Sequence, residues 1–296
     1  MMNHAYGYAA LTFLLLGISP VSQAELEPIS EVAMGEVTGQ AFMNIENIAG
    51  DGVDYTRMTL GIDVETRVNI DDIQVGQIDG GTDFSAQHLA LGHIARNDGE
   101  TFNGVTYNEG EAIPFEARKP YIELAEDSAG LKGFRMGFAE ARGSVSSYTA
   151  SFSGNITGLK IRDDEFDNSV YDATLYAGAG LAETSNRATH VGVKLPGVDT
   201  TCNEGASCAP LTNLRSVTVG EDSGIEGVSG FTDGFFIGFQ RDGMDWQSLD
   251  GANTISAGKG VFINLPVNMT VDMSKLAGDG VDRLRTHQVD MGNNLF

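Results

Sequence analysis

Two long runs of alternating side chains constrain the fold of this chain most. In residues 58–70 every even position is apolar or Thr, and in residues 261–273 every odd position is apolar. A two-residue period is typical of strands that bury one face. At ~3.3 Å per residue, each run is longer than a usual strand. We therefore expect either a long twisted sheet or strands that bend between two sheets, with Pro266 at a bend or an edge.

The rest of the chain also predicts a mainly β protein. Clusters of Gly, Asn and Asp separate shorter alternating stretches, which indicate further strands. These lie at residues 121–124, 134–139, 148–161, 170–176, 190–195, 214–219 and 235–239. Residues 26–37 carry apolar side chains at helical spacing and predict one short N-terminal amphipathic helix. We expect an antiparallel sandwich or an elongated twisted sheet.

The first 24 residues predict export. They contain no Asp, Glu, Lys or Arg, and the apolar run at residues 9–18 precedes a small-residue end at Ala24. This pattern is typical of a cleaved signal peptide, and the run is well short of the ~20 apolar residues that span a bilayer. We predict a signal peptide at 1–24, a helix and lead-in at 25–48, and one large β domain at 49–296. The protein is then expected in the periplasm, in the outer membrane or at the cell surface.

The charge excludes one class of partner. The chain has 41 acidic and 18 basic residues, a net charge of −23. Nucleic-acid binding needs clustered Lys and Arg, so we predict no nucleic-acid partner. No segment after the signal is apolar enough for a membrane helix, so we expect membrane association to be peripheral at most. The acidity is interpreted as protection of exposed strand edges.

The only two cysteines favour a disulfide. Cys202 and Cys208 lie in one Gly-containing loop. An exported chain meets an oxidising compartment, and two thiolates alone make a poor zinc site. We therefore predict a local Cys202–Cys208 disulfide.

A repeated acidic motif suggests calcium, the only cofactor that the sequence brings up. AGDGVDYTR at 49–57 recurs as AGDGVDRLR at 277–285. Oxygen ligands for Ca²⁺ would come from Asp51, Asp54, Asp279 and Asp282. The competing interpretation, which we favour, is that each Asp-Gly pair serves a tight turn.

A second pair of similar segments places four aromatic side chains. GFRMGFAEARG at 133–143 is echoed by GFFIGFQRDG at 234–243. Alternation puts Phe134 and Phe138 on one face, and Phe235 and Phe239 on one face of the second segment. We predict that these faces pack into one core. In a carrier protein the same four side chains would line the ligand cavity.

No motif in the chain indicates catalysis. GxSxG, HExxH, the P-loop and a GxGxxG before a helix are all missing. His88 and His93 are five positions apart, which places them on opposite faces of a strand. We therefore predict a protein that is not an enzyme. An outer-membrane β-barrel is a weaker alternative, because Asn294, Gly292 and Asp290 are in phase with the terminal Phe296.

Several segments within residues 25–165 resemble a known family. They are EVTGQ (36–40), IDVETRVNIDDIQVGQ (62–77), KPYIELA (119–125), GFRMGFAEARG (133–143) and SGNITGLKI (153–161). Together they resemble FilA-type proteins, exported gammaproteobacterial proteins labelled as pilus-system components. The resemblance implies a Gram-negative envelope or surface protein whose partners are other envelope or pilus proteins. It carries no site residues.

From these observations we expect an exported structural or interaction component associated with a pilus. The alternative from another class is a periplasmic carrier or binding module for a hydrophobic ligand or a glycan.

Overall fold

The computed structural model describes residues 42–287, except for 51, 79, 165–167 and 195–200. The described residues belong to one compact unit. The predicted signal peptide and the predicted helix at 26–37 lie outside the described residues. The end of the predicted lead-in is a strand, β1 (Met43–Ala49).

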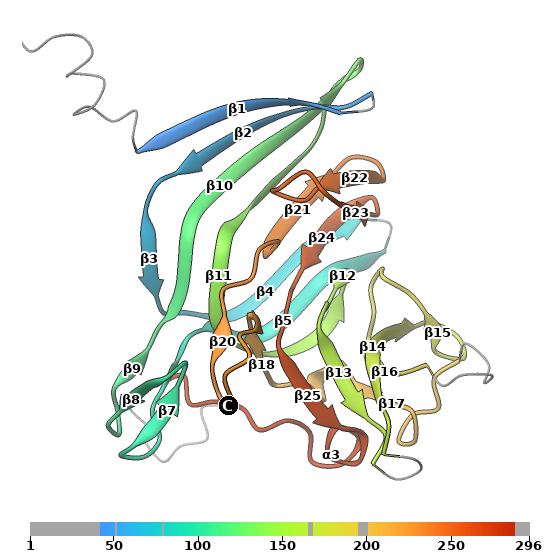
Figure 1. The fold of residues 1–296 in the computed structure, drawn as a ribbon. Coiled ribbons are helices and arrows are strands. Elements are labelled where there is room, and N and C mark those ends of the chain that lie inside the picture. The colour runs from blue at the N-terminus through green and yellow to red at the C-terminus, as the bar shows by residue number, and fades with distance from the viewer. Residues whose placement is uncertain (1–41, 51, 79, 165–167, 195–200, 288–296) are drawn as a thin grey trace, which may run out of the picture. The chain divides into compact units, whose positions relative to one another are not determined.

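The largest sheet holds 11 of the 25 strands in the described residues and is shown in Figure 1. Its 11 strands are β1, β2 (Asp54–Leu60), β3 (Asp63–Thr66), β4 (Val68–Ile78), β5 (Gly81–Leu91), β10 (Phe115–Asp127), β11 (Gly130–Phe152), β12 (Gly154–Asn155), β18 (Ser216–Val219), β21 (Phe236–Gln240) and β24 (Gly260–Asn264). All its pairings are antiparallel except that of β12 with β24.

A second sheet and four hairpin-like pairs complete the described part of the chain. The second sheet has 6 strands: β13 (Leu159–Arg162), β14 (Val170–Ala177), β15 (Ala182–Glu183), β16 (His190–Val193), β17 (Cys208–Pro210) and β25 (Met269–Asp272). The pairs are β6 (His93–Ile94) with β9 (Ala112–Ile113), β7 (Glu100–Phe102) with β8 (Val105–Tyr107), β19 (Glu221–Asp222) with β20 (Ser229–Gly230), and β22 (Met244–Gln247) with β23 (Thr254–Ala257). The helical elements here are a 3₁₀ turn, η2 (Leu211–Asn213), and α3 (Met273–Ala277).

The predicted mainly β fold is confirmed, and both alternating runs break into shorter pieces. Residues 58–70 are divided among β2, β3 and β4, and residues 261–273 among β24, β25 and the start of α3. β3 pairs with β10 whereas β4 pairs with β5, so the first run passes between two groups of strands. Pro266 lies in the gap between β24 and β25, because it lacks the N–H that a continued ladder needs.

One strand, β11, belongs to both halves of the large sheet. Its first part pairs with β10 and β21, and its last part pairs with β5 and β18. Gly143 lies at the change of partners with φ +141°. A Cβ at this position would lie 2.8 Å from a ring carbon of Phe115. Glycine therefore permits the bend both by its backbone freedom and by its small size.

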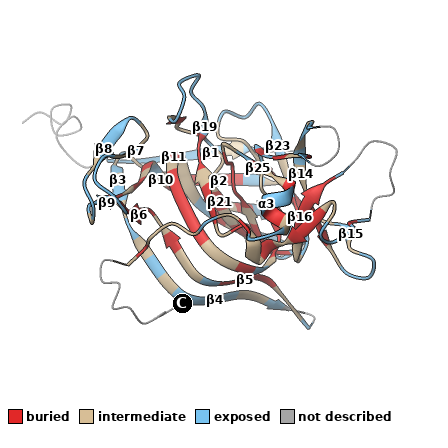
Figure 2. Cartoon of the chain, turned by 90° about the horizontal axis from the view of Figure 1, so that it is seen from below, coloured by how far each residue is buried: buried red, intermediate tan, exposed pale blue. Residues whose placement is uncertain are grey.

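We call the two halves the first leaf (β1, β2, β10, residues 130–142 of β11, β21 and β24) and the second leaf (β4, β5, residues 143–152 of β11, and β18). Figure 2 shows buried residues gathered on β10, β11 and β21, whereas β4 is half-buried or exposed. The main core contains Phe84, Phe115 and Phe152. A smaller core surrounds Trp246 of the β22–β23 hairpin.

Candidate functional site

A large apolar pocket lies between the two leaves. Its volume is about 640 Å³, and it is partly open to solvent. The first leaf supplies lining residues such as Met58, Ile122 and Met136, and the second supplies others such as Ile70 and Leu89. No Asp, Glu, Lys, Arg or His is among the described residues that line it. Ligand pockets of roughly 300–1,000 Å³ with mostly apolar walls are typical of sites for small molecules.

One row of cross-strand partners runs along the first leaf, and from Met58 onward it forms a wall of the pocket. The register places these partners in the order Ile45, Met58, Ile122, Met136, Ile237 and Ile263. Ile45 is 55% exposed, Ile122 is 43% exposed and Met136 is 41% exposed. A continuous apolar row with this much exposure is the kind of surface that binds a ligand or a partner.

In the bent strands β5 and β10, the residues that point toward the pocket change from even to odd positions, or the reverse, partway along the strand. This change keeps the apolar side chains on the pocket side. In β5, Phe84 lines the pocket before His88, and Leu89 and Leu91 line it afterwards. His88 has a φ of +52°, and Lys119 in β10 has a φ of +49°. Such a residue rotates the strand locally, so the inward positions change from even to odd or the reverse.

The four predicted aromatic side chains form two pairs. The rings of Phe138 and Phe235 are stacked with centroids 6.0 Å apart, and both line the large pocket. Phe134 and Phe239 stack at 4.8 Å, but they line a separate cavity of about 440 Å³. Strands β11 and β21 are neighbours in one sheet, so the two similar segments lie side by side rather than face to face.

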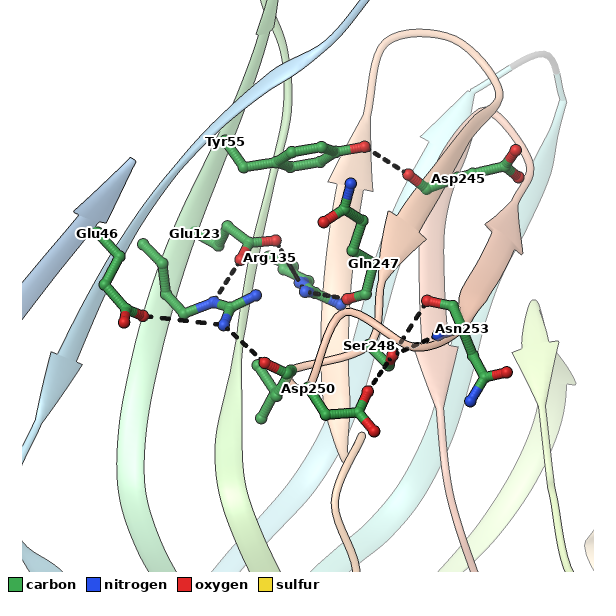
Figure 3. Close-up of polar contacts among 11 residues, drawn as sticks. Glu46, Tyr55, Glu123, Arg135, Asp245, Gln247, Ser248, Asp250 and Asn253 are labelled. Atoms are coloured by element: carbon green, nitrogen blue, oxygen red, sulfur yellow. Dashed lines mark hydrogen bonds and ion pairs between the residues drawn. The ribbon is translucent and has the colours of Figure 1, made fainter. Parts of the chain in front are cut away.

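The other face of the first leaf holds a buried ion cluster, shown in Figure 3. Arg57 Nε donates to Glu123 Oε2 at 2.5 Å, and Arg135 Nε donates to Glu123 Oε1 at 2.9 Å. Arg135 Nη2 also donates to the carbonyl of Gln247 at 2.6 Å, and its guanidinium carbon lies 5.0 Å from the Trp246 ring. These contacts hold the β22–β23 hairpin against the sheet.

Tyr121 lies between this cluster and the pocket. Its ring belongs to the Trp246 core, and the residue also lines the pocket. Burial raises the pKa of Tyr121 to about 12, so the phenol is neutral at physiological pH.

A polar cavity of about 640 Å³ lies beside the β22–β23 hairpin. Its lining includes Asn155, Thr232, Ser248, Asp250 and Asn264. Amide, hydroxyl and carboxylate groups of this kind can hydrogen-bond a polar ligand.

The predicted calcium ligands are not brought together among the described residues. Asp54 begins β2 and Asp279 follows α3, and Figure 1 places these elements at opposite ends of the unit. Asp282 is paired with Lys275 at 3.5 Å, and Asp51 lies outside the described residues. Within the described part of the chain, no group of three or more His, Cys, Asp or Glu is arranged to hold a metal ion. Calcium binding stays a prediction.

The predicted disulfide is confirmed. Cys202 and Cys208 are bonded, with their Cα atoms 5.7 Å apart, and they pack with the buried Tyr176. Disulfides persist in oxidising compartments outside the cytoplasm.

A serine, a histidine and a glutamate form an array that the sequence does not reveal. Ser144 Oγ lies 2.8 Å from His93 Nδ1, and His93 Nε2 lies 3.5 Å from Glu100 Oε1. Ser144 is 0% exposed and His93 is 1% exposed, so this array gives a substrate no access to the hydroxyl. Its contacts are instead those of a buried polar network that joins β6, β7 and β11.

No described helix is long and apolar enough to cross a membrane. Comparisons of the chain with known protein families, with curated proteins and with solved structures find no match.

Proposed function

We propose that this protein is an exported binding protein that holds an apolar ligand in the pocket between its two leaves. The observation that carries the proposal is the pocket of about 640 Å³ with no charged residue in its described lining. Exposed Ile122 and Met136 at the same wall keep apolar surface in contact with water until a ligand covers it.

Ligand binding can be tested on protein purified from the periplasm under native conditions. We expect native mass spectrometry to find a co-purified apolar molecule. After its removal, the fluorescent probe N-phenyl-1-naphthylamine should bind with a Kd in the range of about 1 μM. A chain that carries no ligand and binds no probe would contradict the proposal, as would a dimer that closes the pocket.

A pocket-filling substitution supplies the matched variant. Ser147 lines the pocket from β11, whereas Ala150 on the same strand is exposed outside it. Ser147→Phe should weaken probe binding about tenfold or more, because the added ring occupies the ligand's volume. Ala150→Phe should leave binding unchanged, and an equal loss in both variants would count against this location of the site.

We also propose an interaction role at the envelope or pilus, supported by strand β1. Among the described residues β1 pairs only with β2, so its other edge has free backbone groups. Its sequence MNIENIA has one charged residue and neither Pro nor Lys, the residues that usually protect an edge. Such an edge can accept a strand from another protein.

Cell fractionation tests this second role. We expect the protein in the envelope or appendage fraction, and Ile45→Lys should shift it toward the soluble periplasmic fraction by adding charge to the edge. Wild-type protein found solely as free periplasmic monomer would contradict an envelope or pilus partner.

A further inference from the structure

The large pocket offers no counter-charge to an ionised ligand. None of its described lining residues carries a charge, and the chain as a whole has a net charge of −23. An ionised headgroup inside the pocket would lose its hydration without gaining an ion pair. An anionic headgroup at the mouth would also be repelled by the acidic surface.

The pocket does offer a pair of hydroxyl groups. Ser147 and Thr149 are alternate residues of β11, and both line the pocket. Ser147 Oγ and Thr149 Oγ1 lie 2.8 Å apart, and Thr149 is 8% exposed. Each hydroxyl has one donor and two acceptor positions, so their mutual hydrogen bond leaves one O–H donor and several acceptor positions unused. Neither side chain has a further hydrogen-bond partner within the described residues.

We propose that the pocket is specific for an uncharged lipid with a hydroxyl or carbonyl oxygen, such as a long-chain alcohol or ester. The remaining O–H of the Ser147–Thr149 pair donates to that oxygen, and the apolar walls contact the chain. This inference rests on the proposed binding function and adds to it a ligand class and two specificity-determining residues. An oxygen that lacks a charge is bound at low desolvation cost, whereas a carboxylate of the same chain length is not.

Competition among ligands of equal chain length tests the selectivity. N-phenyl-1-naphthylamine is bound to the delipidated protein and displaced with dodecanol, dodecanoate or dodecane. We expect dodecanol to compete about tenfold more strongly than dodecanoate and several-fold more strongly than dodecane. Equal competition by dodecanol and dodecanoate would overturn the inference, whereas the binding of the probe itself would leave the proposed function intact. Failure of the probe to bind would remove both.

The two hydroxyls are tested with a double variant that keeps the shape of the pocket. Ser147→Ala with Thr149→Val should remove the preference for dodecanol over dodecane, measured as the ratio of the two competition constants in that same variant. Ser151→Ala is the matched control, because Ser151 lies on the same strand but donates to the carbonyl of Thr82 outside the pocket lining. A preference that persists in the double variant would overturn the role of the pair. Ser147→Ala alone provides the same test if the double variant does not fold.

Discussion

At the residue scale, Glu123 has the most constrained environment in the first leaf. Its carboxylate is 0% exposed and pairs with Arg135, which is 1% exposed, and with Arg57, which is 6% exposed. The buried members of the cluster are therefore two positive charges and one negative charge, and Arg57 also lies 4.0 Å from the carboxylate of the exposed Glu46. Removing one partner from such a group leaves the others without compensation.

The variant Glu123→Gln should lower the free energy of unfolding by about 3–5 kcal/mol, because two buried guanidinium groups lose their carboxylate. Urea unfolding followed by fluorescence measures this directly, since the single tryptophan, Trp246, lies in the cluster. Glu140→Gln serves as the control: Glu140 is partly exposed and pairs with Arg118, so its loss should stay below about 1 kcal/mol. Equal losses would show that burial of the charges is not the cause.

His93 should make stability depend on pH. Burial lowers the pKa of His93 below its ordinary value, and the nearby Glu100 offsets only part of this effect. The unfolded chain then binds a proton more readily than the native protein. Stability from this group is present above the ordinary pKa of about 6.5 and is lost as pH falls through the lowered pKa. From about pH 7.5 to about pH 5.5, wild type should therefore lose more stability than His93→Gln in urea titrations, and parallel losses would contradict this account.

At the element scale, the strands of the pocket show how much the sequence could predict. Alternation predicts strands at residues 134–139 and 235–239; the first lies within β11, and β21 begins one residue later, at Phe236. Alternation does not show which face is covered: Arg135 is more buried than Phe134 because the β22–β23 hairpin covers its face. That hairpin lies more than a hundred positions away, so no local pattern reveals the contact.

The change of inward-pointing positions within β5 and β10 is visible in the sequence. The residues of β5 that line the pocket are Phe84 before His88, and Leu89 and Leu91 after it, so the inward positions change from even to odd beside His88. In β10 the corresponding slip lies at Lys119, between Ala117 and Pro120. A search for strands with one fixed phase misses β5 entirely. A search that allows one slip per strand would find both strands and their bends.

Within strand β11, adding a single methyl group at Gly143 should lower the stability of the protein. Gly143→Ala places a methyl group against Phe115 and forces a side chain into φ +141°. We expect a loss of about 1–3 kcal/mol in the free energy of unfolding, with weaker probe binding because the leaves change their angle. Gly258→Ala is the control, since Gly258 has open space around its Cβ position. A neutral Gly143→Ala variant would show that the bend does not need glycine.

At the scale of the whole molecule, the net charge of −23 acts on every part at once. Self-repulsion of this size opposes the compact state and is reduced by salt. The described ion pairs include the buried group at Glu123, which salt screens much less. The effect of the acidic charge on the stability of the folded protein therefore depends on the salt concentration.

The melting temperature should rise as NaCl increases from about 20 mM to about 300 mM, because screening weakens repulsion within the folded chain. Differential scanning fluorimetry measures this shift. CaCl₂ at matched ionic strength separates screening from specific binding: an equal rise shows screening alone, and a larger rise supports the calcium prediction. A melting temperature that falls with NaCl would contradict the role assigned to the net charge.

The continuity of β11 through both leaves determines how the pocket can change its width. Opposite walls are parts of one covalent strand, Gly130–Phe152, rather than two domains joined by a linker. Widening or narrowing the pocket must therefore rotate the backbone near Gly143, while the hydrogen bonds to β10 and β5 resist that rotation on either side. We therefore expect the proposed ligand site to be a cleft of nearly fixed width that accepts apolar chains of different length.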